Sequence, residues 1–238
     1  GAIEAVERLS FWRGCIDASR DIAVGAGIAM WKRREIAAML WGGTPHPLRF
    51  AQGAAPAVEA ARTGGGAIAT WPSRAPRGLD EAAASAGVPV HSVEDGFVRS
   101  VGLGSALHPP LSIILDRQGI HYDPSQPSDL ETLLEGAEMS DQLVGRAERL
   151  ARTIVEAGIT KYGSTRGDFS VDRDGRRIVL VPGQVEDDAS VRLGGGGIAS
   201  NLALLRLVRA ANPEAFIVYK PHPDLEAGLR RGTARLRD

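Results

Sequence analysis

The hydrophobic positions in the first hundred residues alternate between short apolar runs and longer segments whose apolar residues recur with helical spacing. A weakly helical segment, 5–20, comes first. The runs that predict buried strands are 21–28, 47–51, 67–71 and 88–95, and the segments that predict helices are 31–42, 56–66 and 78–87. Strands that alternate with helices of about ten residues are typical of βαβ units. The pattern therefore predicts an α/β fold built on a parallel sheet.

The pattern then continues through one more strand pair and two helices. The apolar run 111–116 is followed by "GIHYD" (119–123), which we interpret as a paired strand. Ser128 and Ser140 stand where two helices should begin, and Glu131 is placed to complete a capping box with Ser128. Both serines are therefore predicted to be N-caps.

The chain changes character between residues 160 and 176, which are polar and rich in turn formers and predict a linker or a hairpin. A second α/β unit follows, with a strand at 178–184, an amphipathic helix that starts at Ser200, and a strand that enters the loop "KPHPD" (220–224). Two strands do not form a parallel sheet that is covered on both faces. We therefore expect this unit to be truncated or to dock on the first one.

Composition narrows the classes of function. The net charge of the 238 residues is -1, which argues against a general nucleic-acid binder, because such a protein needs a basic face. The single cysteine, Cys15, excludes an intrachain disulfide and a zinc site built on several cysteines. No apolar run approaches the roughly 20 residues of a membrane span, and no signal pattern opens the chain. We expect a cytoplasmic protein, cut from something longer because it starts at Gly1.

Candidate chemistry gathers where three strands are predicted to end. These places are "EDG" (94–96), "PGQVEDDAS" (182–190) and "KPHPD" (220–224). Ligands of open α/β sheets bind outside the carboxyl ends of the strands. All three segments could then face one cleft.

The acids Glu94 and Asp95 are neighbours on an extended backbone, so their side chains point in opposite directions and cannot form a facing acid/base pair. One acid can enter the cleft while the other braces the loop or pairs with Arg99. The alternative is that the pair merely ends a strand and accepts hydrogen bonds from the amides that follow.

The second unit offers a choice of the same kind. Glu186, Asp187 and Asp188 suit a metal or a ribose hydroxyl, or else an N-cap ahead of a helix, and Gln184 and Ser190 add neutral hydrogen-bonding groups. Pro221 and Pro223 fix the backbone on both sides of His222. Beside Lys220, this histidine suits a phosphate; the alternative is a solvated loop residue.

The order of the motifs is more specific than any one of them. "EDGFVRSVGLGS", "PPLSIILD", "GIHYD", "PSDLE", "GITKYG", "VLVPGQVEDDAS" and "NLALLRLVRAANPEAFIVYKPHPD" follow one another from about residue 94 to 224, and "VGAGIAMWKRR" stands near the N-terminus. This string resembles the capsule polysaccharide export and biosynthesis family KpsC, also called LipB. The resemblance covers the chain from about residue 20 to its end.

The resemblance implies a fold and an activity. The fold is a GT-B-like pair of Rossmann-type units with parallel sheets: an N-terminal domain at 1–165 for the nucleophile and the acceptor side, and a partial C-terminal domain at 166–238 for the nucleotide-sugar donor. The activity is retaining transfer of Kdo (3-deoxy-D-manno-oct-2-ulosonic acid) from CMP-Kdo, which builds the β-Kdo linker on a glycolipid acceptor.

The resemblance also implies capsule assembly proteins as partners, the inner face of the inner membrane as the place of action, and no metal or cofactor besides the donor. Kdo carries its own carboxylate, for which Arg99 would be a suitable cation. The implied roles are Asp95 as the acid that attacks the anomeric carbon, Glu94 and Arg99 as its supports, Gln184, Asp188 and Ser190 as the lining of the cleft, and Lys220 and His222 as ligands of the CMP phosphate.

The sequence departs from the family pattern in three places. "SAL" (105–107) and "TKYG" (160–163) each carry one residue that differs from the usual motif, and the family's second domain continues beyond "KPHPD". Two alternatives to a transferase therefore stay open. One is a non-catalytic module that binds polysaccharide intermediates or a partner protein. The other is a metal-dependent phosphoesterase built on Glu186 to Asp188 and His222.

Overall fold

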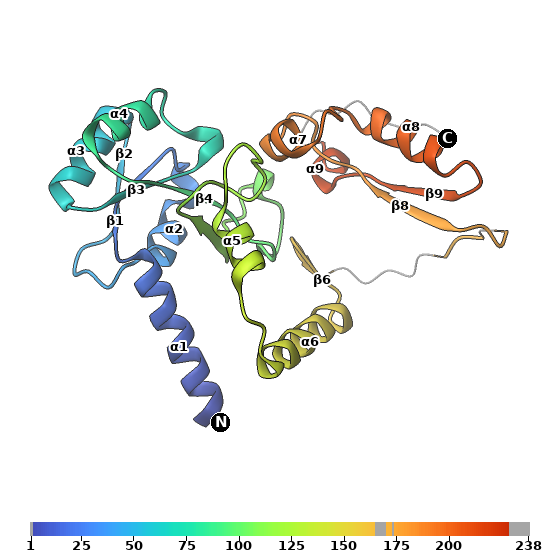
Figure 1. The fold of residues 1–238 in the computed structure, drawn as a ribbon, viewed down its shortest axis with the longest axis horizontal. Coiled ribbons are helices and arrows are strands. Elements are labelled where there is room, and N and C mark those ends of the chain that lie inside the picture. The colour runs from blue at the N-terminus through green and yellow to red at the C-terminus, as the bar shows by residue number, and fades with distance from the viewer. Residues whose placement is uncertain (1, 165–169, 173, 229–238) are drawn as a thin grey trace.

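The computed structural model describes residues 2–164, 170–172 and 174–228, which form two α/β units (Figure 1). The helices and strands of the first unit are α1 (Ala2–Ser19), β1 (Ile22–Ala26), α2 (Arg33–Met39), β2 (Arg49–Ala51), α3 (Ala54–Gly64), β3 (Ala67–Thr70), α4 (Leu79–Ala86), β4 (Val90–Asp95), β5 (Ile113–Asp116), α5 (Asp129–Gly136), α6 (Asp141–Glu156), β6 (Ile159–Thr160) and β7 (Gly163–Ser164). Those of the second are β8 (Ile178–Pro182), α7 (Ala189–Gly194), α8 (Asn201–Ala211), β9 (Phe216–Lys220) and α9 (Pro223–Glu226).

The first unit is a five-stranded sheet with the strand order β2-β1-β3-β4-β5. The four strands from β2 to β4 are parallel, as the alternation of strands and helices predicts. The fold class, an α/β protein with a sheet that is mainly parallel, is confirmed. Because β1, β3 and β4 are parallel, the residues that follow them lie close together at the carboxyl ends of the strands.

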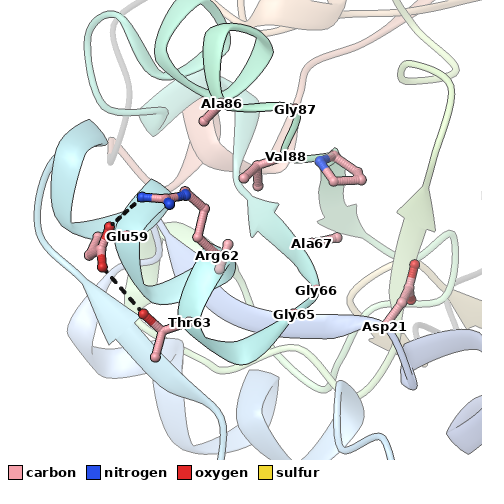
Figure 2. Close-up of a pocket in the computed structure, with 12 residues that line it drawn as sticks. Asp21, Glu59, Arg62, Thr63, Gly65, Gly66, Ala67, Ala86, Gly87 and Val88 are labelled. Atoms are coloured by element: carbon pink, nitrogen blue, oxygen red, sulfur yellow. Dashed lines mark hydrogen bonds and ion pairs between the residues drawn. The ribbon is translucent and has the colours of Figure 1, made fainter.

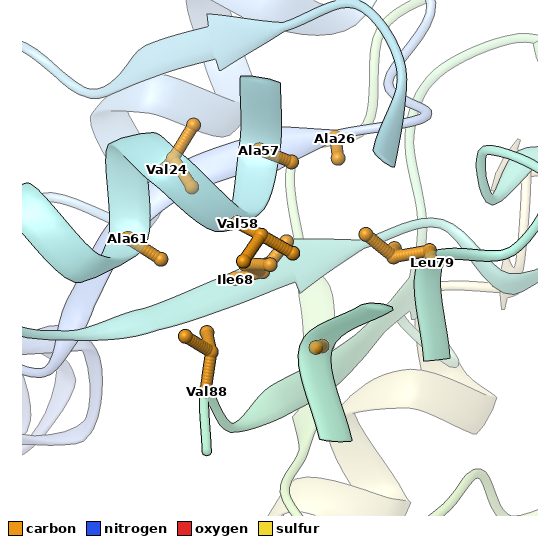
Figure 3. Packing of buried hydrophobic residues seen from close by; sticks show 9 residues of the cluster. Val24, Ala26, Ala57, Val58, Ala61, Ile68, Leu79 and Val88 are labelled. Atoms are coloured by element: carbon orange, nitrogen blue, oxygen red, sulfur yellow. The ribbon is translucent and has the colours of Figure 1, made fainter. Parts of the chain in front are cut away.

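The two faces of the sheet bury different side chains. One face packs Val24 and Ile68 against helices α3 and α4, through residues such as Val58 and Leu79 (Figure 3). The other face packs Ala69, Trp71 and Val93 against Ile36 and Leu40 of α2 and its C-terminus. Ile68 and Ala69 are sequence neighbours that lie in different clusters, since successive side chains of a strand point to opposite faces.

Strand β5 differs from the rest because it pairs with β4 in the antiparallel direction. The chain returns from β4 to β5 through the loop 96–112 without a crossover helix, and a parallel neighbour needs such a crossover. The predicted strand at 119–123 is wrong, because these residues form turns. Both oxygens of the Asp116 carboxylate hold this region, since they accept from the amides of Gln118, Gly119 and Asp129.

The predicted helix starts are confirmed. Ser128 caps α5 in a capping box with Glu131, and Ser140 and Ser200 cap α6 and α8 through their hydroxyl oxygens. The helix predicted at 31–42 begins instead with a turn of 3-10 helix, Met30–Lys32, and α2 ends at Met39. No helix within the described ranges combines the length and the apolar character that a membrane span requires.

The second unit pairs β8 with β9 in the parallel direction. In Figure 1 it is coloured orange to red and lies beside the first unit, with α7 and α9 turned toward it. The Ser105 hydroxyl donates to the Asp224 carboxylate over 2.7 Å, which ties the loop 96–112 to α9. The domain division at residue 165 stays a prediction, because residues 165–169 lie outside the described part of the chain.

Candidate active site

Asp95, the last residue of β4, lies between two cations. Arg99 Nε is 2.7 Å from Asp95 Oδ2, an ion pair whose angle falls outside hydrogen-bond geometry, and Lys32 Nζ is 3.8 Å from Asp95 Oδ1. Lys32 follows β1, and its ammonium stands 3.3 Å from the centre of the Trp71 ring, which follows β3. The carboxyl ends of three parallel strands thus assemble one charged cluster.

The guanidinium of Arg99 is sealed inside the loop that follows Asp95. Its side chain is 0% exposed, and Nη1 donates to the Ser100 hydroxyl over 2.7 Å. A Cβ on Gly104 would come within 2.8 Å of Nη2, so only a glycine lets the loop lie this close to Arg99. A buried charge is costly unless it is paired, and Asp95 supplies the pair.

Glu94 points away from Asp95 and braces the end of the strand. Its Oε1 accepts from the amide of Asp95 over 2.9 Å, and Tyr122 Oη donates to Oε2 at 3.5 Å, the limit of a hydrogen bond. Burial, and after it the charges of Asp95 and Asp188, raise the pKa of Glu94 to about 7. The carboxyl group is therefore half protonated near neutral pH.

The segment 161–163 holds the loop 96–112 through backbone hydrogen bonds. The carbonyl of Lys161 accepts from the amides of Arg99 (2.8 Å) and Ser100 (3.2 Å), and the carbonyl of Tyr162 accepts from the amide of Gly102 (2.9 Å). Burial raises the pKa of Tyr162, and the charges of Asp224 and Asp95 add to it. Tyr162 therefore lies between the charged groups of both units.

In the second unit, several residues of the motif "GQVEDDAS" form hydrogen bonds within the unit. Asp188 caps α7 and accepts from both the amide and the hydroxyl of Ser190. The carboxamide of Asn201 bonds the backbone N–H and C=O of Gln184, and Glu186 accepts from the amide of Asn201. The N-cap interpretation of this acidic stretch is confirmed for Asp188.

In the His-Pro loop, a backbone hydrogen bond to Nδ1 fixes the tautomer of the neutral His222 ring. Its Nδ1 accepts from the amide of Asp224 over 3.2 Å, so the neutral ring carries its proton on Nε2. The ring lies edge-on to Tyr162, with 6.4 Å between centroids. Lys220 ends β9 and is exposed, and its carbonyl accepts from the amide of Gly183.

Comparison with known proteins decides the family. Residues 66–163 and 169–235 match the family described as "Capsule polysaccharide biosynthesis protein". The chain belongs to this family.

Among curated relatives, the "Capsule polysaccharide modification protein LipA" of Neisseria meningitidis serogroup A is 47% identical over 145 residues, which are 61% of this chain and 21% of LipA. The "Lipopolysaccharide-processing protein LpsZ" of Rhizobium meliloti is 40% identical over 177 residues, 72% of this chain and 40% of LpsZ. The chain thus spans between a fifth and two fifths of these relatives.

Two solved structures resemble this capsule polysaccharide biosynthesis protein, both from Thermosulfurimonas dismutans KpsC. Its "beta Kdo 2,4 transferase" has a TM-score of 0.66 and its "beta Kdo 2,7 transferase" one of 0.63, each at 30% sequence identity. Each match covers 88% of this chain, and it covers 63% of the first structure and 64% of the second. These neighbours agree with the GT-B-like fold expected from the sequence.

The structure of this capsule polysaccharide biosynthesis protein brings together some predicted site residues and leaves others apart. Asp95, Glu94 and Arg99 form one cluster, and the charge of Asp188 acts on Glu94. His222 reaches the cluster through Tyr162. Gln184 and Lys220 are exposed on the second unit. Their catalytic and binding roles stay predictions.

Sequence reasoning missed Lys32 and Tyr162 as neighbours of Asp95. The signal for Lys32 was present, because it comes a few residues after the first predicted strand, at the end of the sheet where ligands bind. Tyr162 has no such signal, since only the folded loop carries it between the units. Within the described residues, no three histidine, cysteine or carboxylate side chains gather as metal ligands.

A cavity of about 510 Å³ lies at the opposite end of the strands of the same sheet (Figure 2). It is lined by residues that precede β1, β3 and β4 or open them, among them Asp21, Ala67 and Pro89, and by Glu59 and Arg62 of α3. Glu59 pairs with Arg62 over 3.1 Å in its wall. The amino ends of the strands form this cavity, so it is separate from the cluster around Asp95.

Proposed function

We propose that this chain forms the reactive part of a retaining glycosyltransferase, which moves Kdo from CMP-Kdo onto a glycolipid acceptor to build the β-Kdo linker of a capsular polysaccharide. The support is the family, together with two structural neighbours whose titles name β-Kdo transferases. A glycolipid acceptor, capsule assembly partners and action at the cytoplasmic face of a membrane belong to the same proposal.

One observation carries the proposal: a carboxylate held by two cations at the carboxyl edge of the sheet. Oδ1 of Asp95 is buried and makes no hydrogen bond within the described chain, while Oδ2 faces Arg99. A nucleophilic carboxylate must be held in place and must reach the substrate. The Asp95 side chain is held by both cations and keeps 19% of its surface exposed, whereas Glu94 turns the other way.

The reaction proceeds in two displacements at the anomeric carbon. The Asp95 carboxylate attacks this carbon as the bond to the phosphate of CMP breaks, and CMP leaves with the bonding electron pair. The product is a glycosyl ester of Asp95. A hydroxyl of the acceptor then attacks the same carbon, loses its proton to solvent or a nearby base, and releases the Asp95 carboxylate. Two inversions give net retention.

The second unit supplies the donor half of this proposal. His222 offers Nε2–H and Lys220 offers an ammonium, and both can donate to the phosphate oxygens of the leaving CMP. Gln184, Asp188 and Ser190 line the approach to the nucleotide. Charge that develops on the phosphate is stabilised by these donors, so the reaction as proposed needs no metal ion and no cofactor besides CMP-Kdo.

Arg99 acts through Asp95 in this scheme and does not touch the sugar. Because its side chain is fully buried, it is a positioning residue that fixes Oδ2. Glu94 also positions, since it anchors the amide of Asp95 and carries the hydrogen bond from Tyr122.

The experiment that tests the proposal is the capture of the glycosyl ester. The full natural protein that carries this sequence is incubated with CMP-Kdo and a chelator, without an acceptor, and digested for mass spectrometry. We expect the mass of Kdo on the peptide that contains Asp95, and none in an Asp95→Asn control. Release of CMP without any ester on this peptide, or a strict need for metal, would contradict the proposal.

A further inference from the structure

Lys32 is the second cation beside Asp95, whose carboxylate is already paired with Arg99. Its side chain is 12% exposed, and its ammonium lies against the face of Trp71 and 3.8 Å from Asp95 Oδ1. At this distance the charges attract, but no hydrogen bond forms. Within the described part of the chain, the three N–H donors of Lys32 therefore serve only an ion pair and aromatic rings.

The two cations differ in what they can reach. Arg99 is closed in by the Gly104 backbone and by Ser100, so nothing that enters from outside can contact it. Lys32 sits beside the same Asp95 carboxylate but keeps 12% of its side chain exposed, so a group that enters the site can reach it. Burial lowers the pKa of Lys32, and the charges of Asp95 and Glu94 oppose this shift. An additional anion beside Lys32 would therefore be favourable.

The charge of the cluster changes during the proposed reaction. When Asp95 becomes an ester it loses its negative charge, and Arg99 and Lys32 are left together in a nearly dry site. A buried cation without a counter-ion is costly. A sugar with a carboxylate next to its anomeric carbon brings the missing anion to this point, but a neutral sugar does not.

We infer that Lys32 is the residue that selects an acidic sugar, because its ammonium binds the carboxylate that the sugar carries beside the carbon attacked by Asp95. The inference rests on the proposed function and adds the group that recognises the donor. Lys32 exchanges one anion for another: it faces Asp95 in the free protein and the sugar carboxylate in the ester. Trp71 holds the ammonium in place through both states.

The test measures donor binding in the Asp95→Asn protein, which cannot form the ester. The ligands are CMP-Kdo and an analogue in which a neutral carboxamide replaces the sugar carboxylate. We expect CMP-Kdo to bind about 10- to 100-fold more tightly than the amide, the size of a hydrogen bond between charged groups. Adding Lys32→Met should bring the two ligands within about threefold of each other, with the affinity for CMP itself unchanged.

Lys161→Met is the matched control, because this lysine is close to the site but its ammonium faces the Tyr162 ring, 5.7 Å from the centroid. The Lys161→Met variant should still prefer CMP-Kdo to the carboxamide analogue. A preference that survives Lys32→Met, or equal losses for the acid and the amide, would overturn the inference. Lys32→Gln, which keeps the length and hydrogen-bonding ability, replaces the Met variant if thermal melting shows that the latter does not fold.

Failure of the proposed function has a different signature. Asp95→Asn protein that is folded and binds neither CMP nor CMP-Kdo would remove the proposed donor, and the inference with it. Binding of CMP-Kdo and of the amide with equal affinity would remove only the inference.

Discussion

The two units of this protein bury their strands to very different degrees. In the five-stranded sheet Ile68 and Val93 are 0% exposed, because helices cover the faces on which they lie. In the β8–β9 pair Val181 is buried, but Ile178 is 42% and Leu180 60% exposed. The proposed nucleophile therefore stands on a closely packed element, and the proposed phosphate ligands stand on a lightly packed one.

This difference agrees with what each half of the site has to do. A nucleophile must be held in a fixed geometry, and the packed sheet with the buried Arg99 provides it. The donor half has to admit and release a nucleotide, which is easier for exposed groups such as Lys220. The comparison can be tested by matched changes in the two units.

The largest expected effect separates chemistry from binding. Asp95→Ala should lower Kdo transfer by at least about 10³-fold and leave the Kd for CMP within about twofold, because it removes the group that forms the bond while the proposed CMP ligands lie on the second unit. Thermal melting checks that the variant, in which the buried Arg99 has lost its partner, still folds. His222→Ala should weaken CMP binding about tenfold and also lower transfer at saturating donor, by less than Asp95→Ala does, because it removes one donor to the leaving phosphate. Steady-state transfer assays and calorimetric titration of CMP check both. Substantial transfer by Asp95→Ala would remove it as the nucleophile.

The next effect concerns stability. Ile68→Ala should lower the free energy of unfolding by about 2–5 kcal/mol, because it opens a cavity in a fully buried cluster. Ile178→Ala, the same substitution on the half-exposed β8, should cost about 1 kcal/mol or less. Urea unfolding of both variants gives the two values. Equal losses would show that the second unit is packed as tightly as the first.

The smallest expected effect depends on pH. The pKa of Glu94 is raised from 4.5 to about 7, so the unfolded chain releases this proton first, and stability is lost as pH rises from about 4.5 to 7. Glu94→Gln carries no such loss and should be more stable than the wild type by about 1–3 kcal/mol at pH 8. This advantage should fade below pH 5. Unfolding free energies measured at pH 5 and pH 8 test it, and a difference that is the same at both values would contradict the burial of Glu94.

Sequence patterns were sufficient where local chemistry decides. The capping box of α5 and the serine caps of α6 and α8 follow from residue spacing alone, and so do the four parallel strands. The antiparallel β5 and the turn at 119–123 do not, because Asp116 collects amides from residues up to thirteen positions away.

The candidate site divides in the same way. Alternation along β4 predicted that Glu94 and Asp95 point apart, and the loop after the strand offered Arg99 as a partner. Lys32 and Tyr162 come from segments that are 63 residues before and 67 residues after Asp95, and only the tertiary fold places them beside it. Burial of Arg99 was likewise a property of the folded loop and of Gly104, which no spacing rule reports.

The carbonyl of Lys161 links two parts of the chain that are far apart in sequence. Lys161 lies in the turn between β6 and β7, and its carbonyl accepts from the amides of Arg99 and Ser100. The hairpin β6–β7 and the support of Asp95 therefore share one set of hydrogen bonds. A substitution that disturbs this hairpin is expected to reach Asp95 through Arg99 without touching the carboxylate itself.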